Sequence, residues 1–319
     1  MLTRQHSSLS APICLFLKVS PSKEKIPIRS IGAGGNEVNI GESFRIRSVQ
    51  ELLSGKDMVH GLHRHNFFFV LTLEKGAGRH EIDFVPCKVG NHTVFLLRPG
   101  QVHQLTLKAE STGYLMEFNA EFYPPNHGLS RQLLRAVSHR NHCPLNALPF
   151  EKLIAVLDNI FHEYTHKGEK YQEVIKANLE IFLIELIRNR QHRKNSLMPV
   201  NPYSQERVEE FLELLETQLA DHRQVSYYAR ELNLSPYQLN AITKAALGKT
   251  VSALINDHII LEAKRYLLAT SNQVNQIAYQ LGYEDVSYFI RLFKKHTGLS
   301  PEAFRRTNSH GGLIGVHTH

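Results

Sequence analysis

The stretch from Val286 to Lys295 could do the chemistry of nucleic-acid recognition from one face of a predicted helix. Its outward positions combine polar, basic and small apolar side chains: Val286, Ser287, Ile290, Arg291, Lys294 and Lys295. A guanidinium such as that of Arg291 can bind a guanine edge bidentately, whereas lysines suit phosphates, which add affinity without sequence information. A helix with this outer face favours insertion into a DNA major groove. A helical hairpin with solvated charges remains the alternative interpretation.

The surrounding residues predict a helix-turn-helix that presents this face. Apolar residues recur every three or four positions before the turn, which places them on one side of a first helix: Val274, Ile277, Ala278 and Leu281. Gly282 suits the left-handed turn position, and Asp285 offers an N-cap oxygen to the second helix. We expect the second helix to bury four residues: Tyr288, Phe289, Leu292 and Phe293. Gly298 ends that helix, and Ser300-Pro301 opens another.

An internal repeat strengthens this interpretation. Ala229 and Asn233 precede Ala278 and Gly282 by forty-nine positions, and further matches lie fifty positions apart. Asparagine tolerates the left-handed turn position next best after glycine. The repeat therefore predicts two tandem helix-turn-helix units, joined by a continuous amphipathic helix over residues 251–268.

The pair resembles the DNA-binding domain of the AraC/XylS family of bacterial transcription regulators. The family's signature is present at fixed spacing as Ile277-Ala278, Gly282-Tyr283, Asp285, Ser287, Tyr288-Phe289, Phe293-Lys294-Lys295, Gly298, Ser300-Pro301 and Phe304-Arg305. Thr243 departs from the pattern, because the family usually has an aromatic residue there.

The resemblance implies which residues contact DNA. Base readers would be Tyr237, Asn240 and Ala241 in the first unit, with Gln238 beside them, and Val286, Ser287, Ile290 and Arg291 in the second. Lys244, Lys294 and Lys295 are better suited to phosphates. We expect Arg305 to serve domain packing or the backbone.

Composition agrees with a polyanionic partner and a reducing compartment. The formal charge of the 319 residues is +7, and residues 223–306 hold eleven Lys/Arg against six Asp/Glu, a local balance of +5. Three widely spaced cysteines (Cys14, Cys87 and Cys143) favour neither a disulfide framework nor a zinc ribbon. The apolar run 12–17 is too short for a signal peptide, and no run approaches the roughly 20 residues of a membrane span. We therefore expect a cytoplasmic, nucleoid-associated protein with no membrane partner.

The first half of the chain predicts a β-rich domain. Short strand-like runs separated by Gly, Pro and Asn indicate a small barrel or jelly roll: 44–49, 67–73, 80–84, 93–97, 102–107 and 113–118. The Gly-rich stretch 32–36 precedes strands rather than a helix, so we interpret it as a turn and not as a nucleotide loop.

Three histidines in this half resemble the ligand motifs of the cupin barrel, which is found in the sensor domains of many AraC-type regulators. His63 and His65 match the first motif and His103 the second, but phenylalanines follow where metal-binding cupins have a glutamate. We therefore expect no metal and no cofactor. The alternatives are a non-metal effector cavity formed by His63, His65, Phe67 and His103, or histidines that cap strands beside core phenylalanines.

The remaining segments complete the predicted organisation. Amphipathic helices over 150–164 and 174–190 either pack on the barrel or form a dimer contact, which the resemblance favours for the second helix. We expect an N-terminal arm (1–25), the barrel (26–125), a helical dimerisation or packing region (126–190), a linker (191–204), the DNA-binding domain (205–308) and a disordered tail (309–319).

The sequence thus predicts a multidomain α and β protein: a cupin-like barrel with a helical hairpin, then an all-α domain with two helix-turn-helix units. The implied function is sequence-specific transcription regulation, more often activation, with double-stranded DNA, a small effector, a second copy of the chain and RNA polymerase as partners. One alternative is a metal-dependent cupin enzyme with an appended DNA-binding module. Another is a ligand-independent DNA binder whose barrel only dimerises.

Overall fold

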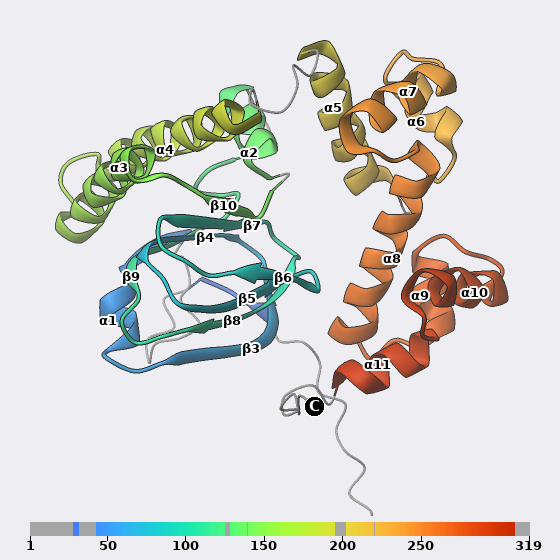
Figure 1. Ribbon diagram of the computed structural model, residues 1–319, viewed down its shortest axis with the longest axis horizontal. Coiled ribbons are helices and arrows are strands. Elements are labelled where there is room, and N and C mark those ends of the chain that lie inside the picture. Colours follow the sequence, from blue (N-terminus) through green and yellow to red (C-terminus); the bar gives the residue numbers. More distant parts are fainter. Residues whose placement is uncertain are drawn as a thin grey trace, which may run out of the picture.

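The computed structural model describes residues 28–31, 43–124, 128–138, 140–194, 202–219 and 221–309. Predictions for the arm 1–25, the turn 32–36, the central part of the linker and the tail from residue 310 onward fall outside these residues. Figure 1 shows the β-rich half and the helical C-terminal half side by side. None of the helices in the described part of the chain combines the length and the apolar composition that a membrane span needs.

Two five-stranded sheets face each other in the β-rich half (Figure 1). The first has the order β1 (Ile28–Arg29), β3 (Met58–His65), β8 (Val102–Leu107), β5 (Gly78–Ile82) and β6 (Val85–Lys88). The second has the order β10 (His142–Pro144), β7 (Thr93–Leu97), β4 (Phe68–Lys75), β9 (Thr112–Phe118) and β2 (Phe44–Ser48). Only β1 and β3 pair in parallel among these strands. This arrangement confirms the cupin-like barrel.

Alternation along β4 divides its side chains between two cores. Phe69, Leu71 and Leu73 point into the barrel interior with residues of β7, β8 and β9, whereas Phe68 and Val70 face the helices outside. This is the period of two that a strand imposes when both of its faces are covered.

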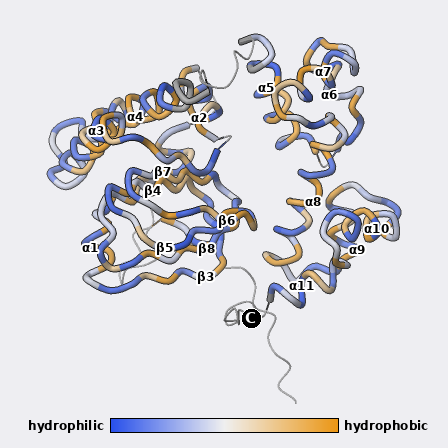
Figure 2. The backbone as a smooth tube through the Cα atoms, viewed as in Figure 1, coloured by the Kyte–Doolittle hydropathy of each residue, from blue (hydrophilic) through white to orange (hydrophobic). Residues whose placement is uncertain are grey.

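Helices cover the outer face of the second sheet. α3 (Ala147–His166) and α4 (Tyr171–Lys194) pack against each other and against that sheet through Leu157, Leu179 and Phe182. Hydrophobic and hydrophilic stretches alternate along both helices in Figure 2, as expected of amphipathic helices. The helices α1 (Val49–Leu53) and α2 (Gly128–Ser138) were not predicted from the sequence. The strand β3, which ends with His63-Arg64-His65 directly before β4, was also not predicted.

Seven helices form the C-terminal half that the structure describes: α5 (Pro202–Gln218), α6 (Val225–Glu231), α7 (Pro236–Leu247), α8 (Val251–Ala269), α9 (Val274–Gln280), α10 (Val286–Thr297) and α11 (Pro301–Ser309). One core joins them, centred on buried residues of α8 such as Ile255, Ile259 and Ala263. The two units α6–α7 and α9–α10 therefore share the helix α8 as their support (Figure 1).

Local turn chemistry is as predicted in both units. Asn233 and Gly282 adopt φ of 55° and 77° at the two turns. In this left-handed region glycine, which has no Cβ, costs least, and asparagine is tolerated because its short polar side chain can hydrogen-bond locally. The Asp285 carboxylate accepts from the backbone N–H of Tyr288 at 3.0 Å and so caps α10. Ser235 and Gln238 form a capping box at the start of α7.

The barrel and the helical half touch through a polar and aromatic contact. The turn between β5 and β6 inserts Asp83, whose carboxylate accepts from Arg265 of α8 at 2.6 and 3.0 Å. The neighbouring Phe84 packs edge-on against Phe304 of α11, with ring centroids 5.9 Å apart. Asp83 also accepts from the backbone N–H of Val102, so the contact is tied to the start of β8.

Candidate nucleic-acid interface and histidine cluster

The outward face of α10 carries the polar and basic side chains that the sequence analysis singled out. Ser287, Arg291, Lys294 and Lys295 are exposed, while Phe289, Leu292 and Phe293 are buried against the core. The predicted inner position of Tyr288 is wrong, because half of this side chain is exposed. Spacing around Phe289 explains the difference: positions three and four residues on continue its stripe, whereas Tyr288 is about 100° away.

Two predicted base readers of α10 are partly withdrawn from solvent. Val286 and Ile290 pack in part against the core of the helical half. Arg291 is free to reach outward, because its only ion pair among the described residues is a 3.8 Å contact to the exposed carboxylate of Asp285. An exposed pair of this length holds the guanidinium only weakly.

Some of the DNA-contacting residues predicted on α7 are exposed, and others are hydrogen-bonded within the protein. Tyr237 is 84% exposed, and Ala241 and Lys244 are exposed beside it. Gln238 accepts from the Ser235 backbone N–H at 2.8 Å, so its side chain serves the capping box. Asn240 donates to the Pro236 carbonyl at 2.9 Å and accepts from the Val251 backbone N–H at 3.1 Å. These two hydrogen bonds occupy one N–H and one lone pair of the Asn240 amide and hold it between Pro236 and Val251.

Arg305 fixes the geometry of the interface from within, as expected. Its guanidinium is buried and donates to the carbonyls of Leu267 at 2.8 Å and Asn272 at 2.6 Å. These carbonyls belong to the end of α8 and the loop before α9. Thr243 is also fully buried, so the departure from the family pattern leaves α7 packed.

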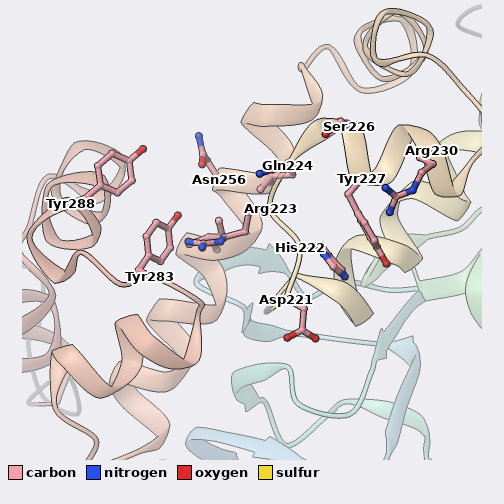
Figure 3. Close-up of a pocket in the computed structure, with 12 residues that line it drawn as sticks. Asp221, His222, Arg223, Gln224, Ser226, Tyr227, Arg230, Asn256, Tyr283 and Tyr288 are labelled. Atoms are coloured by element: carbon pink, nitrogen blue, oxygen red, sulfur yellow. The ribbon is translucent and has the colours of Figure 1, made fainter.

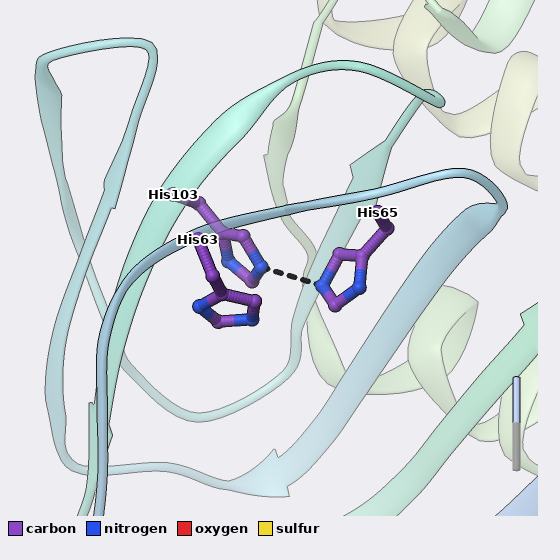
Figure 4. A group of neighbouring side chains, drawn as sticks. All are labelled: His63, His65 and His103. Atoms are coloured by element: carbon purple, nitrogen blue, oxygen red, sulfur yellow. Dashed lines mark hydrogen bonds between the residues drawn. The ribbon is translucent and has the colours of Figure 1, made fainter. Parts of the chain in front are cut away.

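The three predicted histidines meet inside the barrel (Figure 4). His63, His65 and His103 are buried, and one ring nitrogen of each lies within 4.8 Å of the other two. The Nε2 atoms of His65 and His103 share a hydrogen bond of 2.7 Å. Phe67, the fourth predicted effector residue, is buried with its ring centroid 4.4 Å from that of His65.

His80 is a fourth member that the sequence analysis missed. Its Nε2 shares a 2.9 Å hydrogen bond with Nδ1 of His103, and its side chain is fully buried. The pairing of β5 with β8 brings the two strands together. The inward alternation of His80 and Ile82 along β5 could have placed both in the interior, but not beside His103.

Hydrogen bonding fixes the proton positions in part. The Nδ1–H of His63 donates to the Gly61 carbonyl at 2.7 Å, so its Nε2 holds a lone pair. That Nε2 is buried without a hydrogen-bond partner, as are Nδ1 of His65 and Nδ1 of His80. The chain His65–His103–His80 has only two ring-to-ring bonds, so either direction of donation leaves one terminal N–H unpaired.

Burial keeps these imidazoles neutral. Desolvation lowers the pKa of His63 to about 4, and those of His65 and His80 to about 3. The pKa of His103 is lowered in the same direction by burial and by the neighbouring histidines. Neutral rings can accept or donate hydrogen bonds to a small polar ligand or offer lone pairs to a metal.

The donor set fits a divalent transition metal only in part. His63, His65 and His103 would supply three neutral nitrogens, and the bond from His63 to Gly61 would orient one of them, as outer partners commonly do. No carboxylate joins this group among the described residues, and Phe67 and Phe69 lie against His65. The expectation that the protein binds no metal stays a prediction.

Comparison with known proteins matches both halves of the chain. A family model described as "AraC-like ligand binding domain" covers residues 50–183, and one described as "Helix-turn-helix domain" covers residues 228–307. The arabinose operon regulatory protein of Escherichia coli is 30% identical over 151 residues, which are 46% of this chain and 50% of that protein. The chain thus spans about half the length of the arabinose regulators that it matches.

One further relative and one solved structure align over most of the chain. The HTH-type transcriptional activator RhaS of Citrobacter koseri is 25% identical over 76% of this chain and 87% of that protein. The crystal structure of ToxT from Vibrio cholerae aligns at 16% identity over 86% of this chain and all of that one, with a TM-score of 0.42. Together with the tandem units and the cupin-like barrel, the two family matches show that this chain belongs to the AraC/XylS family of DNA-binding transcription regulators.

Proposed function

We propose that this regulator is a sequence-specific transcription activator whose DNA binding responds to a small effector in the barrel. The observation that carries the proposal is the pair of exposed faces on α7 and α10, which one helix, α8, supports (Figure 1). Each face would enter one of two successive major-groove segments. RhaS, the relative with the wider match, bears the name of an activator, which supports activation.

The exposed side chains have distinct roles in this proposal. Arg291 reads a guanine edge, and Tyr237, Ala241 and Ser287 contact neighbouring base edges. Val286 and Ile290 offer apolar contact from the edges of the same face, and Gln238 and Asn240 support α7 beside it. Lys244, Lys294 and Lys295 bind phosphates.

Effector control would use the histidine cluster and its connection to α8. His103 pairs in register with Ile82, and the next residue along the chain is Asp83, which binds Arg265. A ligand that moved His103 would therefore act one residue away from the contact between barrel and helices. The interior is filled by Phe67, Phe69 and Phe95, so binding requires those rings to shift.

A homodimer is supported by the exposed side of α4. Val174 and Ile181 stay 38% and 48% exposed and lie seven residues apart, which places them on one helix face. A second copy of α4 would cover this face. RNA polymerase is the partner that activation requires, and chromosomal DNA as the target requires that the protein work in the bacterial cytoplasm.

Two other functions fit less well. Metal-dependent cupin enzymes use a carboxylate ligand, and this chain has phenylalanines at the corresponding positions. We therefore propose that the protein is not an enzyme. A ligand-independent binder would not need the buried, incompletely hydrogen-bonded nitrogens of His63 and His65. A rise in thermal stability with one compound from a metabolite panel would favour effector control over that function.

Footprinting on DNA upstream of the protein's own gene and neighbouring genes tests the proposal. We expect protection of a specific site. Arg291→Ala should need a higher protein concentration for the same protection, while Arg79→Ala, which replaces an exposed arginine on β5, should leave it intact. Uniform binding of all sequences by the parent protein, with and without the panel of compounds, would contradict sequence-specific recognition.

A further inference from the structure

A polar cleft separates the two helix-turn-helix units (Figure 3). Its volume is about 600 Å³. The loop before α6 and α6 itself line one side, the turn after α9 and the first turn of α10 line the other, and Ile255, Asn256 and Ile259 of α8 lie between them. The cleft therefore lies between the two faces proposed to enter the major groove.

The charged groups of the cleft favour an anion. Arg223 and Arg230 line it with one carboxylate, that of Asp221, and Arg230 also forms an exposed ion pair with Glu231 at 3.3 Å. The Arg223 guanidinium lies 4.4 Å above the ring of Tyr283, and no ion pair joins it to a carboxylate within the described residues. An aromatic ring holds a guanidinium in place without neutralising it, so its charge remains available.

The neutral groups of the cleft are those that commonly contact the DNA backbone. Gln224, Ser226, Tyr227, Asn256 and Tyr288 add amides and hydroxyls around the two arginines. Side chains of these types, like arginine and lysine, are among the groups that hydrogen-bond to phosphate and sugar in protein–DNA complexes.

The position of the cleft matches that of the backbone on a docked duplex. Tyr288 lines the cleft and lies three residues before Arg291, on the same exposed side of α10. In the first unit the cleft is lined by α6, and the first helix of a helix-turn-helix crosses the DNA backbone when the second enters the groove. Between two successive major-groove segments the duplex turns its minor groove and both flanking phosphate strands toward the protein.

We propose that this cleft binds the phosphate backbone of the duplex between the two major-groove segments, with Arg223 as its principal contact. The contact between Arg223 and Tyr283 could not be predicted from the sequence, because the two residues lie sixty positions apart and meet only in the folded domain. This inference rests on the proposed binding of DNA by both units. It adds a contact that strengthens binding equally for all sequences.

The test measures the DNA affinity of the parent chain and of Arg223→Ala as a function of salt concentration. The probes are a labelled duplex that holds the footprinted site and a shuffled duplex of equal length. The logarithm of the affinity falls linearly with the logarithm of the salt concentration, and loss of one phosphate contact makes this slope less steep by about 0.9. The affinity ratio of parent to variant should therefore fall about 3.5-fold between about 50 and 200 mM salt, on both duplexes.

Two matched variants separate charge from position. Arg223→Lys keeps the charge and should restore most of the slope, and Arg79→Ala removes a charge on β5 and should leave it unchanged. Unaltered thermal unfolding midpoints establish that the variants are folded.

An unchanged slope for Arg223→Ala would overturn the proposal, as would a loss confined to the specific duplex, which indicates base reading instead. If the parent chain does not distinguish the two duplexes, sequence-specific regulation fails. The slope on the shuffled duplex still decides whether the cleft binds phosphate.

Discussion

Acid should destabilise the barrel through its buried imidazoles, because these rings must stay neutral in the folded chain. Burial lowers the pKa of His65 and His80 to about 3, from an ordinary value of 6.5. Between these values the unfolded chain binds more protons than the folded chain. The contribution of these neutral imidazoles to the free energy of unfolding is therefore fully present above pH 6.5, and it is lost as the pH falls from 6.5 toward 3.

The magnitude follows from the two protonation equilibria. At pH 5, a histidine with a pKa of about 3 when folded and about 6.5 when unfolded costs about 2 kcal/mol relative to pH 7.5. His65 and His80 together should remove about 4 kcal/mol, a large part of the roughly 5–15 kcal/mol that stabilises a typical domain. His63 and His103 act in the same direction.

Urea unfolding between pH 7.5 and 5 measures this loss, followed by circular dichroism because the chain has no tryptophan. His80→Gln removes one titrating ring, so its free energy of unfolding should fall with pH by about 2 kcal/mol less than that of the parent. His162→Gln, at an exposed position of α3, is the control and should follow the parent. A parent stability that is constant over this range, or equal pH dependence in both variants, would refute the reasoning.

Three further outcomes are expected. Arg291→Ala should cost about 1–3 kcal/mol of binding at the cognate site and relax specificity at one base position, and equal losses on a shuffled duplex would contradict base reading. Asp83→Ala and Arg265→Ala should each destabilise the contact between barrel and helices by about 3 kcal/mol, since both side chains are at most 13% exposed; additive effects in the double variant would show that the pair is not coupled. Elemental analysis of protein purified without chelators should find far less than one transition-metal ion per chain, whereas an equimolar ion would favour the enzyme alternative.

The helix-turn-helix units could be predicted because local chemistry determines them. The left-handed positions at Asn233 and Gly282 and the cap at Asp285 depend on residues close in sequence. Apolar spacing then gives the helices their buried faces. The same reasoning misplaced Tyr288, because an aromatic side chain beside Phe289 is equally compatible with the core and with an exposed face.

Residue types and resemblance also identified His63, His65 and His103 as a group, since the spacing of the motifs is a property of the chain. Whether they bind an effector, and whether the domain boundaries lie where predicted, stay predictions.

Contacts between distant segments were decided only by the tertiary structure. His80 joins the cluster through the pairing of β5 with β8, Arg223 meets Tyr283 across the cleft, and Asp83 binds Arg265 182 residues away. Each contact depends on how whole elements pack. That packing is stabilised by many apolar contacts, each of them weak, between residues far apart in the sequence. The sequence by itself determined the helices of the helix-turn-helix units, most of the barrel strands and the types of side chain available for recognition. The packing of those elements decided which side chains meet, because hydrogen bonds and ion pairs form only over a few ångströms.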